Sequence, residues 1–139
     1  NTHTTMTNCT TSGDVINNCN DTKNEYFGGL AGQIENNMTT KITGCTVTAN
    51  LTVKVTKRDA DHFSGIVVGR LTDKVDGSGA DATVSTTIQN VTVKGGSYNG
   101  TALTAENLDT YTFGHASNYG GKLYTKGGSY ATTGITFAE

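Results

Sequence analysis

The sequence predicts an all-β chain, and three features of composition and pattern lead to that prediction. Of the 139 residues, 27 are Thr and 18 are Gly, and Pro is absent. Thr is β-branched and suits the half-buried surface of a pleated sheet, whereas Gly supplies turns with positive φ. Few windows combine a helical period with good helix formers, and two phrases recur at a fixed spacing. We therefore expect strands joined by tight turns.

One recurring phrase is a short strand signal that occurs three times. Residues 6–11 (MTNCTT), 42–47 (ITGCTV) and 88–93 (IQNVTV) align at spacings of 36 and then 46 residues. An aromatic, glycine-rich phrase also recurs after 36 residues when it is aligned from Phe27 to Phe63. Periods of 20–50 residues are typical of solenoids. The sequence therefore predicts a β-solenoid, in which strand-turn-strand units stack around one narrow core; the alternative is a β-sandwich, because alternating strands with glycine turns also build sandwiches.

The repeat predicts which residues lie above one another. The glycines of the second phrase are expected to let the backbone turn sharply, and the extra residue at Val67-Val68, opposite Ala31, is expected to form a bulge. Cys9 and Cys45 occupy one repeat position, so we expect both to point into the core as small apolar side chains. The expected stacked pairs are Phe27 with Phe63, Leu30 with Ile66, and Ile42 with Ile88.

Four further segments complete the predicted order of elements. Residues 48–56 alternate strictly and place Ala49, Leu51, Val53 and Val55 on one face of a strand. Residues 94–98 (KGGSY) recur unchanged at 126–130, each as a strand that runs into a tight turn. Residues 73–81 are polar and glycine-rich and predict an enlarged loop between coils. Residues 111–116 (YTFGHA) form a third, degenerate copy of the aromatic phrase.

Length and charge narrow the class of protein. The chain fits a single domain over residues 1–139, and its first residue, Asn, lies inside a strand-like run, which predicts a piece of a longer protein. The formal net charge is −2, without a basic stripe, so nucleic-acid binding is not expected. No apolar run reaches the roughly 18 residues of a membrane span, so we expect no membrane insertion of this segment.

The two phrases together resemble the GLUG-type repeat of bacterial cell-surface proteins. Gly28-Gly29-Leu30-Ala31-Gly32 matches the glycine-rich first part, and Ile42 and Cys45 match the strand that follows it. The second copy departs from the pattern, since it has one more residue in the glycine phrase and Val91 in place of Cys. The resemblance covers about residues 5–95. It implies an extracellular segment of a large, secreted or surface-anchored adhesin, with flanking domains in the same chain and no catalytic residues.

No arrangement of residues predicts catalysis or a metal centre. The three His are far apart, and the three Cys lack the paired spacing of zinc ligands; a disulfide between two of them stays open. Asp59 with Asp61 and Asp73 with Asp76 are the candidate acid pairs of a glycan-cleaving enzyme, but both sit in polar loops where solvated acids are the default. We therefore expect a non-enzymatic chain without a cofactor. Asp76 and Asp81 flank a partial match to a calcium-binding turn and are the expected ligands if calcium binds.

The tyrosines of the last third are the candidate ligand-binding residues. Flat rings beside amide and hydroxyl groups suit sugars, and Tyr with Gly, Ser and Asn is a frequent binding-surface mixture. The simpler interpretation is that these rings cover the end of the core. We expect a host or cell-surface glycan or protein as partner; the alternatives are a receptor-binding module of a phage-like fibre, which would be trimeric, and a glycan-processing domain. The candidates are Tyr98, Tyr111, Tyr119, Tyr124 and Tyr130.

Overall fold

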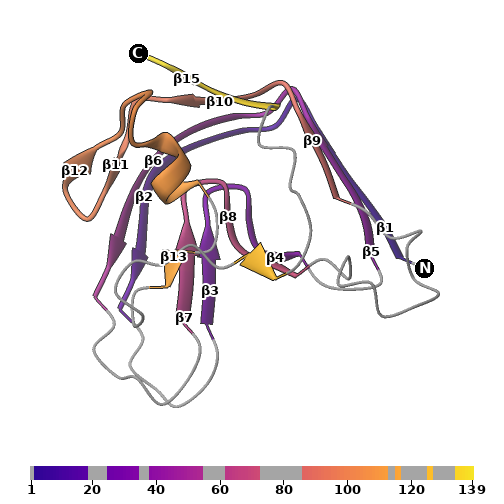
Figure 1. The fold of residues 1–139 in the computed structure, drawn as a ribbon, viewed down its shortest axis with the longest axis horizontal. Coiled ribbons are helices and arrows are strands. Elements are labelled where there is room, and N and C mark those ends of the chain that lie inside the picture. The colour runs from indigo at the N-terminus through magenta and orange to yellow at the C-terminus, as the bar shows by residue number, and fades with distance from the viewer. Residues whose placement is uncertain are drawn as a thin grey trace.

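The computed structural model confirms the prediction of an all-β chain. It describes residues 2–18, 25–34, 38–54, 62–72, 86–112, 115–116, 125–126 and 134–139. Within these ranges there are fifteen strands and one short helix. The strands curl round on themselves, with β3 and β7 inside the bend of β2 and β6 (Figure 1). The elements are β1 (Thr2–Thr7), β2 (Thr10–Asn17), β3 (Glu25–Gly28), β4 (Ala31–Ile34), β5 (Met38–Thr43), β6 (Thr46–Val53), β7 (His62–Gly65), β8 (Val68–Thr72), β9 (Thr86–Gln89), β10 (Val91–Lys94), β11 (Ser97–Tyr98), β12 (Thr101–Ala102), α1 (Leu108–Tyr111), β13 (His115–Ala116), β14 (Thr125–Lys126) and β15 (Ile135–Ala138).

Strands one repeat apart pair in parallel and in register. We call β1–β4 the first level, β5–β8 the second, β9–β14 the third and β15 the fourth. β1 pairs with β5 and β2 with β6 at an offset of 36 residues, as in Thr10 opposite Thr46. The next step has the expected offset of 46, so Ile42 lies opposite Ile88. The three copies of the strand phrase therefore lie side by side, and β1, β5 and β9 run together along one arm (Figure 1).

A left-handed residue forms the corner between consecutive strands at each of these three levels. Asn8, Gly44 and Asn90 occupy the same repeat position and have φ of 54°, 68° and 52°. Gly and Asn tolerate this conformation better than other residues do. A Cβ on Gly44 would also collide with Oδ1 of Asn8, so the middle corner admits only glycine without displacing its neighbour. The N–H of Gly44 donates to the carbonyl of Gln89 at 3.0 Å, which ties the second corner to the third level.

The aromatic phrases also pair in parallel, but the predicted register is wrong by one residue. Tyr26, not Phe27, lies opposite Phe63, and the two rings stack with centroids 6.0 Å apart. The N–H of Leu30 donates to Val67 at 3.0 Å, so Leu30 is aligned with Val67 and not with Ile66. The offset stays at 37 through both phrases, and the expected bulge at Val67-Val68 is absent from this pairing. The extra residue lies before the phrase, because eight residues separate β6 from β7 and seven separate β2 from β3.

The glycines of the aromatic phrase permit close packing of the backbone, and Gly29 also lies in the bend between β3 and β4, where we predicted a sharp turn. None of Gly28, Gly29, Gly32 and Gly69 has positive φ. A Cβ on Gly69 would lie 2.5 Å from the carbonyl oxygen of Phe27 and 2.6 Å from that of Gly32. A Cβ on Gly29 would collide with the carbonyl oxygen of Ile66. The two levels therefore approach each other so closely that side chains are excluded at these positions.

The core is a thin layer that follows the stack. In β6 the alternating residues Val47, Ala49 and Leu51 are buried, as the strand pattern predicted, and Val53 is half-buried. Burial of each large aliphatic side chain contributes about 1.5–3 kcal/mol. Val55 lies outside the described residues.

The two described cysteines follow the predicted column. Cys45 is fully buried and Cys9 half-buried, and both are free thiols. The prediction that they act as small apolar core residues is therefore confirmed for Cys45, and Cys9 packs against the same core from the first level. Cys19 lies outside the described residues.

The sheet that contains β2, β6 and β10 is polar on the face that points away from the core. The side-chain amide of Asn50 donates to Asp14 at 3.0 Å, and the Ser97 hydroxyl donates to the amide oxygen of Asn50 at 3.1 Å. These bonds join β2, β6 and β11 on the solvent side. The same face carries four threonines in adjacent register positions, Thr10, Thr46, Thr92 and Thr136.

The third level departs from the regular stack. After β10, Gly95 and Gly96 have φ of 62° and 89°, and the pairing with β6 changes its offset from 46 to 47 at β11. This confirms the predicted strand and tight turn in residues 94–98; the second copy, at 126–130, lies largely outside the described residues. The degenerate aromatic copy does lie beside the second level, since the N–H of Ile66 donates to Tyr111 at 2.8 Å. However, β13 runs antiparallel to β7, whereas β3 runs parallel to it.

Candidate binding site at the C-terminal end

Two of the five predicted tyrosines meet at the third level. The rings of Tyr98, on β11, and Tyr111, at the end of α1, stack with centroids 4.7 Å apart and planes inclined by 20°. Tyr98 is only 4% exposed and Tyr111 is half-buried. Tyr98 therefore has little ring surface for a ligand, and the pair forms a wall of the core at this end. The binding role of the tyrosines stays a prediction, and Tyr119, Tyr124 and Tyr130 lie outside the described residues.

The environment of Tyr98 keeps its hydroxyl neutral. Burial, reinforced by the nearby Tyr111, raises the pKa of Tyr98 well above its ordinary value. A buried phenolate would lose its hydration, and this loss opposes ionisation of the hydroxyl. Tyr98 thus acts as a neutral aromatic support, and an open surface has to be sought beside it.

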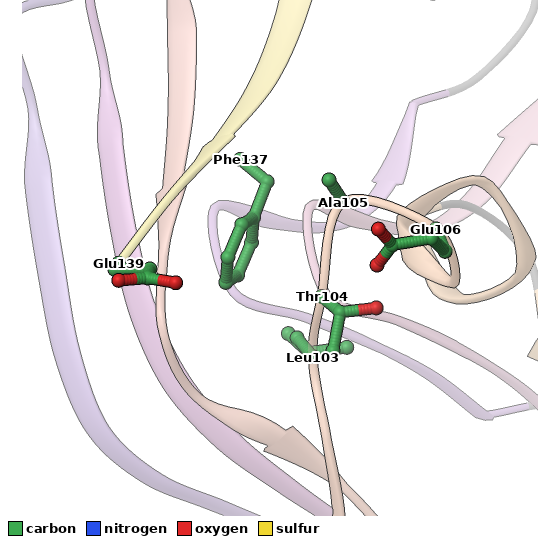
Figure 2. A pocket seen from close by; sticks show the side chains of 6 residues that line it. All are labelled: Leu103, Thr104, Ala105, Glu106, Phe137 and Glu139. Carbon is green, nitrogen blue, oxygen red and sulfur yellow. The ribbon is translucent and has the colours of Figure 1, made fainter.

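That surface is a hollow of about 380 Å³ between β15 and the segment that follows β12. In Figure 2 the ring of Phe137 stands between Glu139 and the segment 103–106. Phe137 is half-buried and packs against the core, as does the buried Leu103. The hollow therefore has an apolar floor. Its lining residues are Leu103, Thr104, Ala105, Glu106, Phe137 and Glu139.

Hydrogen bonds hold the segment on one side of the hollow in a single shape. The N–H of Thr104 donates to the Asn107 side chain at 2.8 Å, and the N–H of Asn107 donates to the Thr104 hydroxyl at 3.3 Å. The Asn107 amide also donates to the carbonyl of Ala102 at 2.9 Å, and the N–H of Leu103 donates to Gly96 at 3.0 Å. Such a reciprocal pair is the device that closes the first turn of many helices. It presents Thr104 and its neighbours as a preformed edge.

The hollow is acidic. Its six lining residues include the carboxylates of Glu106 and Glu139 and no basic side chain. The Thr104 hydroxyl and the backbone N–H of Glu106 both favour the charged carboxylate and hold the pKa of Glu106 below its ordinary value. Glu106 is exposed, so this charge faces solvent and is ready to pair with a ligand. An aromatic ring, a hydroxyl and two carboxylates can bind a polar molecule that has one apolar face.

The lining residues were not predicted from the sequence, although a signal for one of them exists. Residues 134–137 (GITF) resemble residues 44–47 (GCTV), and the structure places Phe137 in the column of Val47 and Val93. A fourth, degenerate copy of the strand phrase was therefore present at the end of the chain. The spacing of Thr104 and Asn107 is a second signal, because reciprocal side-chain bonds need that separation.

A second aromatic cluster lies on the first two levels and has a structural role. The guanidinium of Arg70, on β8, donates to the Tyr26 hydroxyl at 2.6 Å and lies 4.9 Å from the centre of the same ring. The Cζ atom of Arg70 also lies 5.9 Å from the centre of the ring of Phe63, which is buried. This cation–π arrangement joins β3, β7 and β8 and accounts for the aromatic residue of the repeated phrase.

The remaining sequence-based candidates are not described by the structure. The acid pairs Asp59 with Asp61 and Asp73 with Asp76, and Asp81 of the partial calcium turn, lie outside the described residues. In the ranges that the structure covers, no group of three or more metal-ligating side chains comes together. No helix in the same ranges has the length and apolar character needed to cross a membrane.

Comparison with known proteins supports one part of the interpretation. Residues 23–54 match the family described as the GLUG motif. This segment contains β3 to β6, that is, the glycine-rich phrase of the first level and the strand phrase of the second. The chain has no significant match among curated proteins or among solved structures. Residues 23–54 are therefore a GLUG-type repeat region.

Proposed function

We propose that the chain is a non-catalytic module of an extracellular, cell-surface adhesin, built as a short β-solenoid stalk that binds a glycan or a protein at its C-terminal end. The GLUG-type region supports the surface assignment, since the resemblance implies it. In-register parallel pairing at offsets of 36 and 46 residues supports the solenoid over the sandwich, because sandwiches pack two antiparallel sheets.

The observation that carries the stalk proposal is the difference between the two ends of the stack. In the described part of the chain, each first-level strand pairs on one side only. Apart from the buried Ile34, most of its core residues are half-buried, whereas the second-level residues beside them are buried. Another coil of the same kind, from flanking sequence, would cover this edge as the second level covers the first. The half-buried residues are Met6, Cys9, Val15 and Leu30.

The other end of the stack carries elements that do not repeat. The antiparallel strands β12 and β13 and the helix α1 lie there, and the acidic hollow opens beside them. Elements that do not repeat are free to vary without disturbing the pairing of the repeated strands, and this favours a binding role for them. We therefore propose that the candidate binding surface lies at this end of the module.

A glycan array and a sedimentation experiment test the proposal together. The purified chain, labelled and applied to immobilised glycans and to surface proteins of host cells, is expected to bind a restricted set. Antibodies against the chain are expected to label intact cells of the source organism. Absence of binding to glycans and proteins alike would contradict the binding role, and labelling only after cell lysis would contradict the location. A trimer in sedimentation would favour a fibre module instead, and turnover of any glycan would favour the enzyme.

A further inference from the structure

The hollow of residues 103–106, 137 and 139 has the size and shape of a site for one small ring. Its volume of about 380 Å³ lies near the lower end of the range of about 300–1,000 Å³ that small-molecule sites occupy. The floor is made by Phe137 and Leu103, and the rim carries Thr104, Glu106 and Glu139. A ligand would therefore rest an apolar face on the Phe137 ring and turn polar groups toward the rim.

The chemistry of the rim selects the charge of that ligand. Ionised carboxylates accept hydrogen bonds and donate none, and the six lining residues bring no cation to balance them. Sugar hydroxyls and an ammonium group both donate to carboxylates, but only the ammonium also relieves the local negative charge. An aromatic face beneath the ligand favours a cation further.

We infer that the hollow binds a sugar ring that carries a free, protonated amine. This inference rests on the proposed function and names the class of glycan that the C-terminal end of the module recognises. The apolar face of the ring lies on Phe137, and its amine pairs with one of the two rim carboxylates, Glu106 or Glu139, which lie on opposite sides of the Phe137 ring (Figure 2). The Thr104 hydroxyl holds Glu106 in place through the hydrogen bond that it donates to that carboxylate.

Binding of three matched sugars to the whole chain tests the inference. Glucosamine, N-acetylglucosamine and glucose share one ring and differ in the group at a single carbon. In a titration followed by amide NMR, glucosamine is expected to shift the signals of Thr104 to Asn107 and of Phe137. It is expected to bind about twofold to fivefold more tightly than the two neutral sugars, which is the gain of one exposed ion pair. Equal affinity for the three sugars, or shifts confined to other residues, would overturn the inference.

Variants of the rim separate the contribution of charge from that of folding. Glu106→Gln and Glu139→Gln keep the shape of the side chain, and the variant that removes the carboxylate paired with the amine is expected to reduce glucosamine affinity about twofold to fivefold without changing glucose affinity. No loss in either variant would overturn the inference. Asp109→Asn is the matched control, because Asp109 is exposed on α1 and does not line the hollow. All three variants are expected to keep the thermal unfolding midpoint of the parent chain. A loss of glucosamine affinity of the same size in Asp109→Asn would show that the effect comes from the overall charge of the chain and would overturn the site.

Two further experiments are needed. One distinguishes an amino sugar from a protein lysine as the ligand, and the other distinguishes the inference about the hollow from the adhesin proposal. A blocked lysine, with its amide ends capped, is expected to bind at least tenfold more weakly than glucosamine, because it lacks the ring that covers Phe137; tighter binding by lysine would assign the hollow to a protein partner and overturn the sugar. If the glycan array shows binding to neutral glycans that is unchanged in Glu106→Gln, the inference about the hollow fails while the adhesin proposal stands. If nothing on the array binds but glucosamine shifts the rim signals, the hollow stands and the adhesin proposal fails.

Discussion

Replacing Gly69 by Ala tests whether the glycines of the repeated phrase are required by close backbone approach. The added Cβ would lie 2.5 Å from the carbonyl oxygen of Phe27, 2.6 Å from its nitrogen and 2.6 Å from the carbonyl oxygen of Gly32. All three are backbone atoms of the first level, so no side-chain rotation relieves the clash. To restore ordinary contact the two levels would have to separate by about 1 Å at a position where β4 pairs with β8.

The expected loss of stability follows from this geometry. Overpacking a core costs about 1–3 kcal/mol when side chains can adjust, and we expect about 3 kcal/mol or more here because only backbone can move. That is a large part of the roughly 5–15 kcal/mol that stabilises a typical domain. For a chain of this length, 3 kcal/mol corresponds to a fall of about 10 °C in Tm. Urea unfolding followed by circular dichroism measures the difference, with the slope m checked for a change in cooperativity.

Gly100→Ala is the control that separates crowding from backbone conformation. Gly100 has φ of 79° and no atom within 4 Å of a Cβ placed on it. Its substitution introduces only the strain of a left-handed alanine, about 1–2 kcal/mol. The interpretation is refuted if Gly69→Ala unfolds within 0.5 kcal/mol of the parent, or if Gly100→Ala is the more destabilised of the two.

Three further predictions concern the core and the aromatic clusters. Ile42→Ala removes a fully buried side chain and is expected to cost about 2–5 kcal/mol in urea unfolding, whereas Ile16→Ala, at a residue that is 51% exposed, is expected to cost under about 1 kcal/mol; equal losses would contradict the stacked core. Because the pKa of Tyr98 is raised in the folded state, the stability that depends on its protonated hydroxyl is complete below about pH 10 and is lost as the pH rises further, by up to about 1.4 kcal/mol per pH unit. Tyr98→Phe should flatten this alkaline fall in the free energy of unfolding. An unchanged pH profile would contradict the argument that Tyr98 is buried. Arg70→Met keeps the aliphatic stem but removes the charge over Tyr26, and we expect it to cost about 1–2 kcal/mol in the same assay, with Arg70→Lys intermediate; a neutral Arg70→Met would show that the cation–π cluster is incidental.

The strand phrase was predictable because its pattern encodes both the register and the corner. Ile42 and Ile88 are alike and lie at one offset from a corner residue, so a single alignment satisfies both levels. A shift of one residue would turn the apolar set outward, and such a slip is costly where one face is buried. The prediction that these residues are neighbours was therefore well determined.

The aromatic phrase was aligned wrongly because identical phenylalanines were weighted above glycines. An offset of 37 places Gly28 opposite Gly65 and needs no bulge, and it exchanges one aromatic residue for another at Tyr26 and Phe63. A ring fits either alignment, since aromatic side chains adapt their contacts, whereas a glycine that faces backbone permits only one. Positions without room for a Cβ, rather than the largest side chains, set the register here.

The hollow lay beyond sequence reasoning because one of its walls is the segment 103–106, which does not follow the repeat. Phe137 continues the column of Val47 and Val93, which are fully buried because another level covers each of them. In the described part of the chain β15 pairs only with β10, and the ring of Phe137 faces the segment 103–106 across the hollow (Figure 2). That segment is irregular, so it fills the space incompletely and brings Glu106 to the rim. A segment of this kind has no period from which its place in the fold could be predicted, so the hollow that it lines could come only from the structure.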